Sequence, residues 1–241
     1  MSYRFISHRY DFLNRSDGAK IYLLPKPYCE RCAEPIHPSY AGSGLCYHCY
    51  NGKTQVDQIN LSRVYAASVY ISHSSIGHNL SEEIKKCKHD LSYTEKLAEV
   101  LEHAIKKMYP ELRYYNIITY PPRGSKTARE NHIEKIADIL SARVGIRSRD
   151  LLYKLVNYPS QQTLSREKRI ENVRDKIGCK EYVDNQKVIV IDDVYTTGAT
   201  LLNSAKALKR MGARKVVGLV LGRAVNINHL LYIEAIEEIK D

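Results

Sequence analysis

The chain has 241 residues, of which 44% are hydrophobic, and this is enough apolar material for one domain and a small additional module. No apolar run approaches the roughly 20 residues of a membrane-spanning helix, and the first ten residues lack the apolar core of a secretion signal, so we expect a cytoplasmic protein with no membrane insertion. The formal net charge is +10, and residues 113–180 hold 15 Lys and Arg against 7 Asp and Glu, which favours a polyanionic partner, either a small phosphorylated substrate or a nucleic acid.

The first motif along the chain consists of two cysteine pairs. Cys29 and Cys32 form one Cys-x-x-Cys pair, and Cys46 and Cys49 form a second one after thirteen intervening residues. This spacing can close four thiolates around one tetrahedral ion, and the Pro- and Gly-rich segment between the pairs is too short for a core of its own. Two disulfides would fit the same count, but they suit a reducing compartment poorly. We predict a structural Zn²⁺ held by all four cysteines, with His48 facing solvent.

The rest of the chain alternates between strand and helix patterns. Such alternation predicts an α/β fold with a parallel sheet that binds ligands at the carboxyl ends of its strands. We divide the chain into a lead-in and zinc module, residues 1–60, and an α/β domain, residues 61–241. The expected strands are 63–71, 115–120, 151–156, 188–191 and 216–221, and the expected helices are 80–88, 95–108 and 128–142.

Two basic segments of this domain are candidate anion-binding elements. Residues 121–126, Pro-Pro-Arg-Gly-Ser-Lys, follow an expected strand, so Pro122, Arg123 and Gly124 are candidates for a loop that receives a diphosphate, although such a sequence is also an ordinary loop. The segment 158–173 is long for a connection. It is either a lid that closes Arg166, Lys168 and Arg169 over a phosphate-rich ligand or a surface helix with solvated charges.

The most specific pattern follows the expected strand 188–191, whose four β-branched residues suit burial on both faces. Asp192 and Asp193 come next, and they can accept hydrogen bonds from sugar hydroxyls or help to hold Mg²⁺. The following turn offers hydroxyls, backbone N–H groups and the start of a helix, all of which suit a phosphate. A surface turn uses similar residues, but the whole line is more specific. We predict Asp192 and Asp193 as catalytic residues beside a phosphate site at Thr196, Thr197, Gly198, Ala199 and Thr200.

This line resembles the phosphoribosyl-pyrophosphate signature of type I phosphoribosyltransferases. In order along residues 28–222, several segments are similar to the ComF family, whose members are linked with natural competence and DNA uptake. The segments are the two cysteine pairs, Tyr65-Ala66-Ala67, Ile84-Lys85-Lys86-Cys87-Lys88, Ser160-Gln161 with Leu164-Ser165, Arg169 and Asn172-Val173, and the run from Asp192 to Thr200.

The resemblance implies a phosphoribosyltransferase-like core with an N-terminal zinc module. It implies that Asp192 and Asp193 meet the ribose hydroxyls, that residues 196–200 wrap the 5′-phosphate, and that residues 122–124 take the diphosphate with Mg²⁺. The family usually carries an Arg-Gly-Phe-Asn-Gln-like segment after that loop, whereas this chain continues Arg123-Gly124-Ser125-Lys126, so no acceptor is predicted.

The sequence therefore predicts a protein that binds 5-phosphoribosyl-1-pyrophosphate, or a related nucleotide, together with Mg²⁺. It is expected to be a phosphoribosyltransferase of nucleotide metabolism that transfers or releases the phosphoribosyl group. The alternative is a non-catalytic protein on the same fold that handles single-stranded DNA during natural transformation. A DNA grip would weaken steeply with salt, which distinguishes the two.

Overall fold

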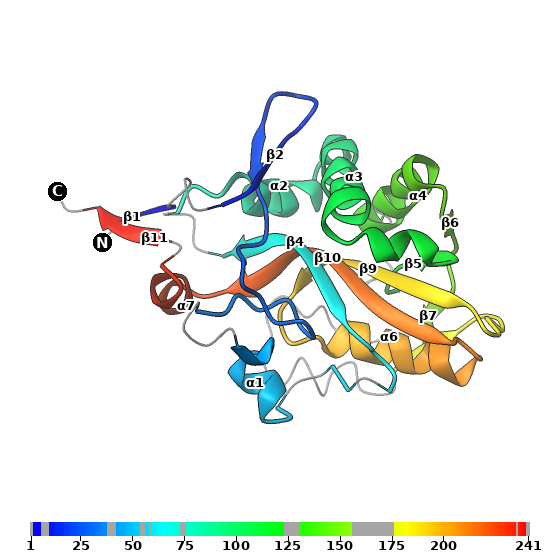
Figure 1. Ribbon diagram of the computed structural model, residues 1–241. Coiled ribbons are helices and arrows are strands. Elements are labelled where there is room, and N and C mark those ends of the chain that lie inside the picture. The colour runs from blue at the N-terminus through cyan, green and yellow to red at the C-terminus, as the bar shows by residue number, and fades with distance from the viewer. Residues whose placement is uncertain are drawn as a thin grey trace.

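The computed structural model describes residues 2–5, 10–37, 42–53, 56–57, 59–72, 76–122, 131–155, 176–234 and 236–239. Its centre is a sheet of five parallel strands (Figure 1), in the order β4, β10, β9, β5, β6. The prediction of an α/β fold with a parallel sheet is confirmed. The strands are β4 (Val64–Ile71), β5 (Ile117–Thr119), β6 (Arg147–Ser148), β9 (Lys187–Tyr195) and β10 (Lys215–Val225).

The sheet is covered on both faces, as the β-branched run at 188–191 predicts. Val188 and Val190 pack into one apolar cluster, whereas Ile189 and Ile191 pack into another, because successive strand residues point to opposite faces. Figure 1 shows α6 on one side of the sheet, together with the cysteine module and its short helix α1, and α2, α3 and α4 on the other side. The helices are α1 (Tyr47–Tyr50), α6 (Ala199–Arg210), α2 (Asn79–Cys87), α3 (Thr94–His103) and α4 (His132–Val144).

The helix predictions hold in place, with differences at the ends. The helix expected at 95–108 is α3 followed by a π-helical turn, Ala104–Met108, and 3₁₀ turns flank this region at Leu91–Tyr93 and Pro110–Tyr114. The helix expected at 128–142 is α4, whose N-cap Asn131 accepts a hydrogen bond from the backbone N–H of Ile133 at 3.2 Å. Residues 128–130 lie outside the described part of the chain. In that part, no helix is long and apolar enough to cross a bilayer.

The strand expected at 151–156 does not belong to the parallel sheet. Instead, β7 (Leu152–Lys154) pairs antiparallel with β8 (Ile177–Cys179) in a separate two-stranded sheet. The fifth strand of the main sheet is β6, which has only two residues. A two-residue strand carries no hydrophobic period, so sequence analysis had nothing to detect.

One glycine sets how closely α6 approaches the sheet. Gly218 lies in the middle of β10, and a Cβ atom there would be 2.7 Å from Leu201 Cδ1 of α6 and 3.3 Å from Val64 Cγ2 of β4. Leu201 and Val64 are each 1% exposed. The first turn of α6 therefore packs against a strand position that has no side chain.

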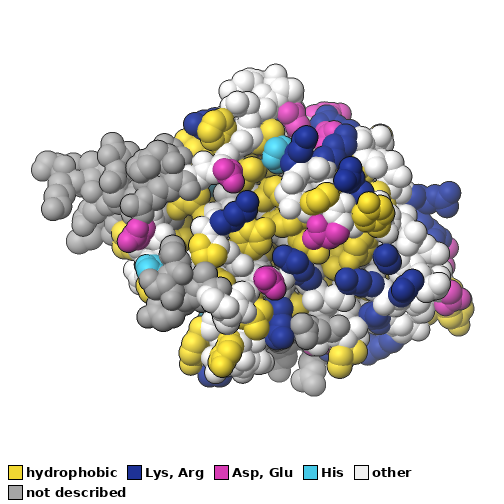
Figure 2. Space-filling model, viewed as in Figure 1, with side chains coloured by type: hydrophobic (Ala, Val, Ile, Leu, Met, Phe, Trp, Pro, Cys, Tyr) yellow, Lys and Arg dark blue, Asp and Glu magenta, His cyan; other side chains and the backbone are white. Residues whose placement is uncertain are grey.

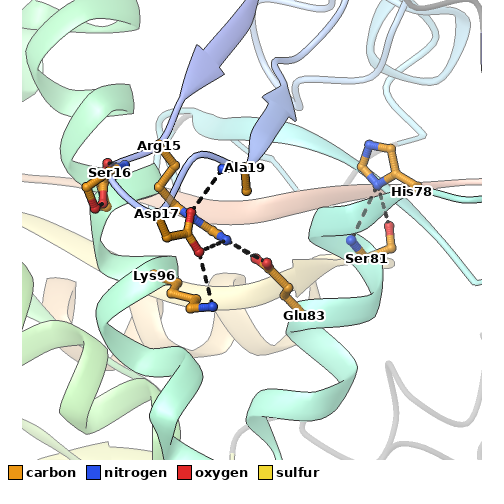
Figure 3. Close-up of polar contacts among 9 residues, drawn as sticks. Arg15, Ser16, Asp17, Ala19, His78, Ser81, Glu83 and Lys96 are labelled. Carbon is orange, nitrogen blue, oxygen red and sulfur yellow. Dashed lines mark hydrogen bonds and ion pairs between the residues drawn. The ribbon is translucent and has the colours of Figure 1, made fainter.

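The N-terminal lead-in forms a hairpin fastened to the helices. Its strands β2 (Phe12–Asn14) and β3 (Lys20–Tyr22) pair antiparallel. The connection holds Arg15, which is 3% exposed and donates to Glu83 of α2 at 2.5 and 2.7 Å and to Asp17 at 2.8 Å (Figure 3). Lys96 of α3 lies 3.1 Å from the same Asp17 carboxylate. The hydrogen bond from Arg15 holds the pKa of Asp17 well below its usual range.

The two ends of the chain also meet. Strand β1 (Ser2–Phe5) pairs antiparallel with β11 (Ile236–Ile239), and the helix α7 (Ile227–Tyr232) connects β10 to this small sheet. Figure 1 shows this pair beyond the arrowheads of β4 and β10, next to α7.

Candidate functional site

The two acidic residues lie where β9 extends past its neighbour. Pairing between β9 and β5 ends at Val190 opposite Thr119, but β9 remains paired with β10 through Asp192 and Val194. The strand is therefore longer than expected, and both carboxylates belong to it instead of following it. Because β5 stops short, its exit at Pro121 and Pro122 reaches the same edge of the sheet.

Three elements converge on Asp193. Lys88, at the C-cap of α2, places its Nζ 2.8 Å from Asp193 Oδ2, and His132, the first residue of α4, places its Nε2 3.7 Å from the same oxygen. The other carboxylate oxygen accepts a hydrogen bond from the backbone N–H of Val194 at 2.7 Å. Within the described residues, the buried Nε2 of His132 has no hydrogen-bond partner.

The carboxylates of Asp192 and Asp193 have opposite protonation tendencies. Burial, and then the charge of Asp193, raises the pKa of Asp192 to about 8. Burial acts in the same upward direction on Asp193, but His132 and the charge of Lys88 outweigh it and bring the pKa of Asp193 below its usual range. For Lys88, burial opposes the charged form, but the charge of Asp193 overcomes it and the pKa of Lys88 is raised. The surroundings therefore favour the charged form of Asp193 and the protonated form of Asp192.

The turn after β9 leads directly into α6. Gly198, with φ of 82° and ψ of 1°, is the N-cap of α6 and has no side chain of its own to cap this end. The Thr197 hydroxyl accepts a hydrogen bond from the Ala199 N–H at 3.3 Å. A Cβ atom on Gly198 would lie 2.5 Å from the Tyr195 ring, so both the backbone angle and the close packing require glycine here. The turn thus combines threonine hydroxyls with the positive end of a twelve-residue helix.

The four cysteines of the module lie together, as predicted. Their Sγ atoms are all within 4.8 Å of one another, and all four side chains are buried. The separation between Cys32 Sγ and Cys46 Sγ is 3.6 Å, close to the roughly 3.8 Å expected between thiolates around tetrahedral zinc. His48 lies on α1 and is not part of this group. Four thiols with this spacing fit a structural Zn²⁺.

Of the other predicted site residues, only Pro122 lies in the described part of the chain. Pro122 is described and half-buried at the exit of β5, whereas Arg123 and Gly124 of the predicted diphosphate loop lie outside the described residues. The predicted lid residues Arg166, Lys168 and Arg169 also lie outside them.

Three residues of the site were not among the predicted site residues, although Lys88 ends one of the segments that resemble the ComF family. Lys88 and His132 reach Asp193 from α2 and α4, and Arg223 of β10 donates to the backbone carbonyl of Tyr195 at 3.1 Å. The sequence offers only weak positional signals: Lys88 ends an expected helix, Arg223 comes just after an expected strand, and His132 lies in the first half of the helix expected at 128–142. In the view of Figure 2, Lys and Arg side chains are spread over the right half of the molecule, the half that carries α3 and α4.

No protein-family model matches the sequence, and no curated protein does. Among solved structures, the hypoxanthine phosphoribosyltransferase from Staphylococcus aureus is 11% identical over 56% of this chain and 75% of its own, with a TM-score of 0.35. The purine phosphoribosyltransferase from Pyrococcus horikoshii is 18% identical over 54% of this chain and 88% of its own, with a TM-score of 0.34. The allosteric regulatory enzyme of purine biosynthesis is 20% identical, with a TM-score of 0.36. The match covers 54% of this chain but only 25% of the length of that enzyme.

Proposed function

We propose that this protein binds 5-phosphoribosyl-1-pyrophosphate together with Mg²⁺ and transfers or releases its phosphoribosyl group, as the resemblance to ComF proteins implies. The observation that carries the proposal is that β9, which holds the acidic pair, leads directly into the turn at the N-terminus of α6. Asp193 is held ionised by Lys88, and a few residues later Gly198 opens the N-terminus of α6. A ribose 5-phosphate needs these two features side by side, one for hydroxyls and one for the phosphate.

The chemistry would be displacement of diphosphate from the ribose C1. This reaction needs no covalent nucleophile, because positioning and charge neutralisation lower its barrier. Asp192 and Asp193 would orient the ribose hydroxyls, and the turn 196–200 would hold the 5′-phosphate. Bound Mg²⁺ would neutralise charge on the diphosphate, which residues 122–124 would receive. The acceptor is left open, because no described residue suggests a base-recognition pocket.

The raised pKa of Asp192 gives this binding a defined dependence on pH. A protonated Asp192 accepts hydrogen bonds from ribose hydroxyls less well than the carboxylate does, so binding of the donor should strengthen as pH rises towards 8. Lys88 keeps Asp193 available as a charged acceptor across the same range.

Calorimetric titration with the pyrophosphate donor and Mg²⁺ tests the proposal. We expect the wild type to bind, and the double variant Asp192→Asn/Asp193→Asn to lose most of its affinity. Asp11→Asn is a matched control, because Asp11 is an exposed acid on the lead-in whose side chain is 77% accessible. Binding by the double variant as tight as that of the wild type would show that the carboxylates do not serve the ligand.

We propose, in addition, that Cys29, Cys32, Cys46 and Cys49 hold one structural Zn²⁺. The donor set and the spacing of the sulfur atoms support this assignment. Because four protein ligands complete the coordination, the ion would stabilise the module and take no part in the reaction.

A second candidate function is the handling of single-stranded DNA, which the concentration of positive charge at residues 113–180 favours. Fluorescence anisotropy with a labelled oligonucleotide separates the candidates. A DNA-binding protein should lose affinity log-linearly with salt and be indifferent to the Asp192→Asn/Asp193→Asn change. Binding that depends on Mg²⁺ and the acidic pair would support the phosphoribosyl function instead.

A further inference from the structure

Arg223 lies against the backbone that leads into the phosphate turn. It is 9% exposed and stands near the carboxyl end of β10. Its Nη1 donates to the carbonyl oxygens of Tyr195 at 3.1 Å, Thr196 at 3.4 Å and Ala224 at 2.9 Å, and its guanidinium lies 4.9 Å from the centre of the Tyr195 ring. A buried cation thus holds the last residue of β9 and the first residue of the turn.

The same guanidinium is bound by the cysteine module. Arg223 Nη2 donates to Glu34 Oε2 at 2.8 Å, and Glu34 follows Cys32 by two residues. Glu34 is itself held in place, since His229 Nδ1 lies 4.0 Å from Glu34 Oε1 and His229 Nε2 lies 2.9 Å from the carbonyl oxygen of Pro35. The side chains of Glu34 and Arg223 are 16% and 11% exposed. This ion pair is therefore largely shielded from solvent and spans 189 residues of sequence.

We propose that Glu34 and Arg223 are a positioning pair through which the metal-loaded cysteine module sets the shape of the phosphate turn, so that metal binding and phosphate binding strengthen each other. This inference rests on the proposed function, because it concerns the same turn.

The geometry of the peptide bond explains how the pair would act. In a trans peptide, the carbonyl of one residue and the N–H of the next point in opposite directions. When Arg223 holds the carbonyls of Tyr195 and Thr196, the N–H groups of Thr196 and Thr197 point away from the guanidinium. Those N–H groups would then be fixed as donors on the ligand side of the turn, before any ligand arrives.

The carboxylate of Glu34 is needed because an unpaired buried guanidinium is unstable. Without Glu34, the Arg223 guanidinium would turn towards solvent or another partner and would release the carbonyls of Tyr195 and Thr196. The position of Glu34 depends in turn on the fold of the cysteine module, which has little core of its own. Linkage requires the coupling to be reciprocal, so the factor by which zinc tightens phosphate binding equals the factor by which phosphate tightens zinc binding.

The experiment measures that factor with ribose 5-phosphate as the probe. Calorimetry on zinc-loaded and zinc-depleted wild type should show about tenfold tighter binding with zinc, within the usual range of such couplings. A chromophoric chelator should report zinc affinity raised about tenfold by ribose 5-phosphate. In Glu34→Gln, both affinity ratios, that of zinc on ribose 5-phosphate and that of ribose 5-phosphate on zinc, should fall towards one. Glu30→Gln, an exposed acid of the same module, is the matched control and should keep both.

Two further measurements distinguish positioning from a general loss of structure. In zinc-loaded Glu34→Gln, the ¹⁵N–H resonances of Thr196 and Thr197 should shift while zinc stoichiometry stays at one. Arg223→Lys, which keeps the charge, should retain more affinity than Arg223→Met. If zinc-depleted protein unfolds, the test is the affinity of the two zinc-loaded variants for ribose 5-phosphate, which should be lower for Glu34→Gln than for Glu30→Gln.

The outcomes separate this inference from the function on which it rests. Wild type that binds ribose 5-phosphate equally well with and without zinc, or Glu34→Gln that binds as the control does, would overturn the positioning pair and leave the phosphate site standing. Wild type that fails to bind ribose 5-phosphate under any condition would instead remove the proposed function, and with it this inference.

Discussion

At the scale of single residues, the acidic pair shows what sequence can and cannot predict. The placement of Asp192 and Asp193 near the carboxyl end of a buried strand follows from the pattern, but their different protonation tendencies do not. That difference comes from Lys88 and His132, which lie in elements distant in sequence and meet Asp193 only in the folded chain. A short acidic motif carries no information on the residues that will lie beside it in the folded chain.

Asp192 gives a prediction about stability. Its pKa of about 8 lies above that of a carboxyl in an unfolded chain, near 4, so its contribution to stability is complete below about pH 4 and is lost as pH rises through 8. Asn cannot ionise and can still accept the hydrogen bond from the N–H of Asp193. We therefore expect Asp192→Asn to be more stable than wild type at pH 8, by at most about 5 kcal/mol, and within about 1 kcal/mol of it at pH 4.5.

Urea unfolding at pH 4.5, 6 and 8 measures this difference. The variant should gain stability over wild type as pH rises while it loses affinity for the ligand, the usual exchange at a functional site. A difference that is constant across the three pH values would mean that Asp192 is already ionised in the folded protein at low pH.

At the scale of elements, most of the parallel sheet and the helices that cover it could be predicted, but its short edge strand and the N-terminal hairpin could not. The strands β4, β9 and β10 have eight, nine and eleven residues, most of them buried in β4 and β10, whereas β6 has two residues and the hairpin strands β2 and β3 have three each. The hairpin depends on Arg15, a charged residue that any sequence rule would place at the surface.

Arg15 should be a major determinant of stability. Its side chain is 1% exposed and ion-paired to Glu83 and Asp17, so Arg15→Met removes the guanidinium from Glu83 and leaves Asp17 with Lys96, and it should cost about 3 kcal/mol. Lys106→Met removes one half of an exposed pair with Glu102 and should cost at most about 0.5 kcal/mol. Denaturant midpoints of the two variants provide the test, and equal losses would contradict the role given to Arg15.

The N-cap of α2 should make the protein sensitive to acid. His78 is 2% exposed, its Nδ1 lies 2.8 Å from the Ser81 hydroxyl (Figure 3), and burial lowers its pKa to about 4. An unfolded histidine takes up a proton near pH 6.5, so stability falls as pH drops from 6.5 towards 4.

His78→Asn keeps a capping residue but removes this titration. The stability advantage of wild type over the variant should therefore shrink by about 1 kcal/mol between pH 7 and pH 5.5, measured by urea unfolding. An advantage that does not change with pH would show that His78 is not held neutral.

At the scale of the whole molecule, the cysteine module and the α/β domain share a core. Cys29, Cys32, Cys46 and Cys49 belong to the same apolar cluster as Val188 of β9 and the inner face of α6. Cysteine spacing predicts that the four thiols meet, but it does not say against which surface the module packs. That surface is formed by residues far along the chain, whose arrangement depends on the complete sheet.

Removing the metal should therefore destabilise more than the module. We expect a chelator, or Cys29→Ser, to lower the Tm of the whole domain by roughly 5–10 °C, since a loss of a few kcal/mol has this effect in a chain of this size. Cys179→Ser changes a cysteine outside the cluster and should leave the Tm nearly unchanged. Scanning calorimetry that shows no shift on chelation would argue that the thiols hold no structural ion.

The vacancy opposite Leu201 at Gly218 has a consequence for variants of this protein. Adding one methyl group there would bring a Cβ within 2.7 Å of Leu201 Cδ1 and 3.3 Å of Val64 Cγ2, so the Leu201 side chain, or the first turn of α6 with it, would have to shift. Leu201 is only 1% exposed, so the N-terminal end of the helix should be disturbed, although position 218 lies in a neighbouring strand and is itself fully covered. Screens for loss of ligand affinity should therefore recover alterations on β10 that no inspection of the binding residues would suggest.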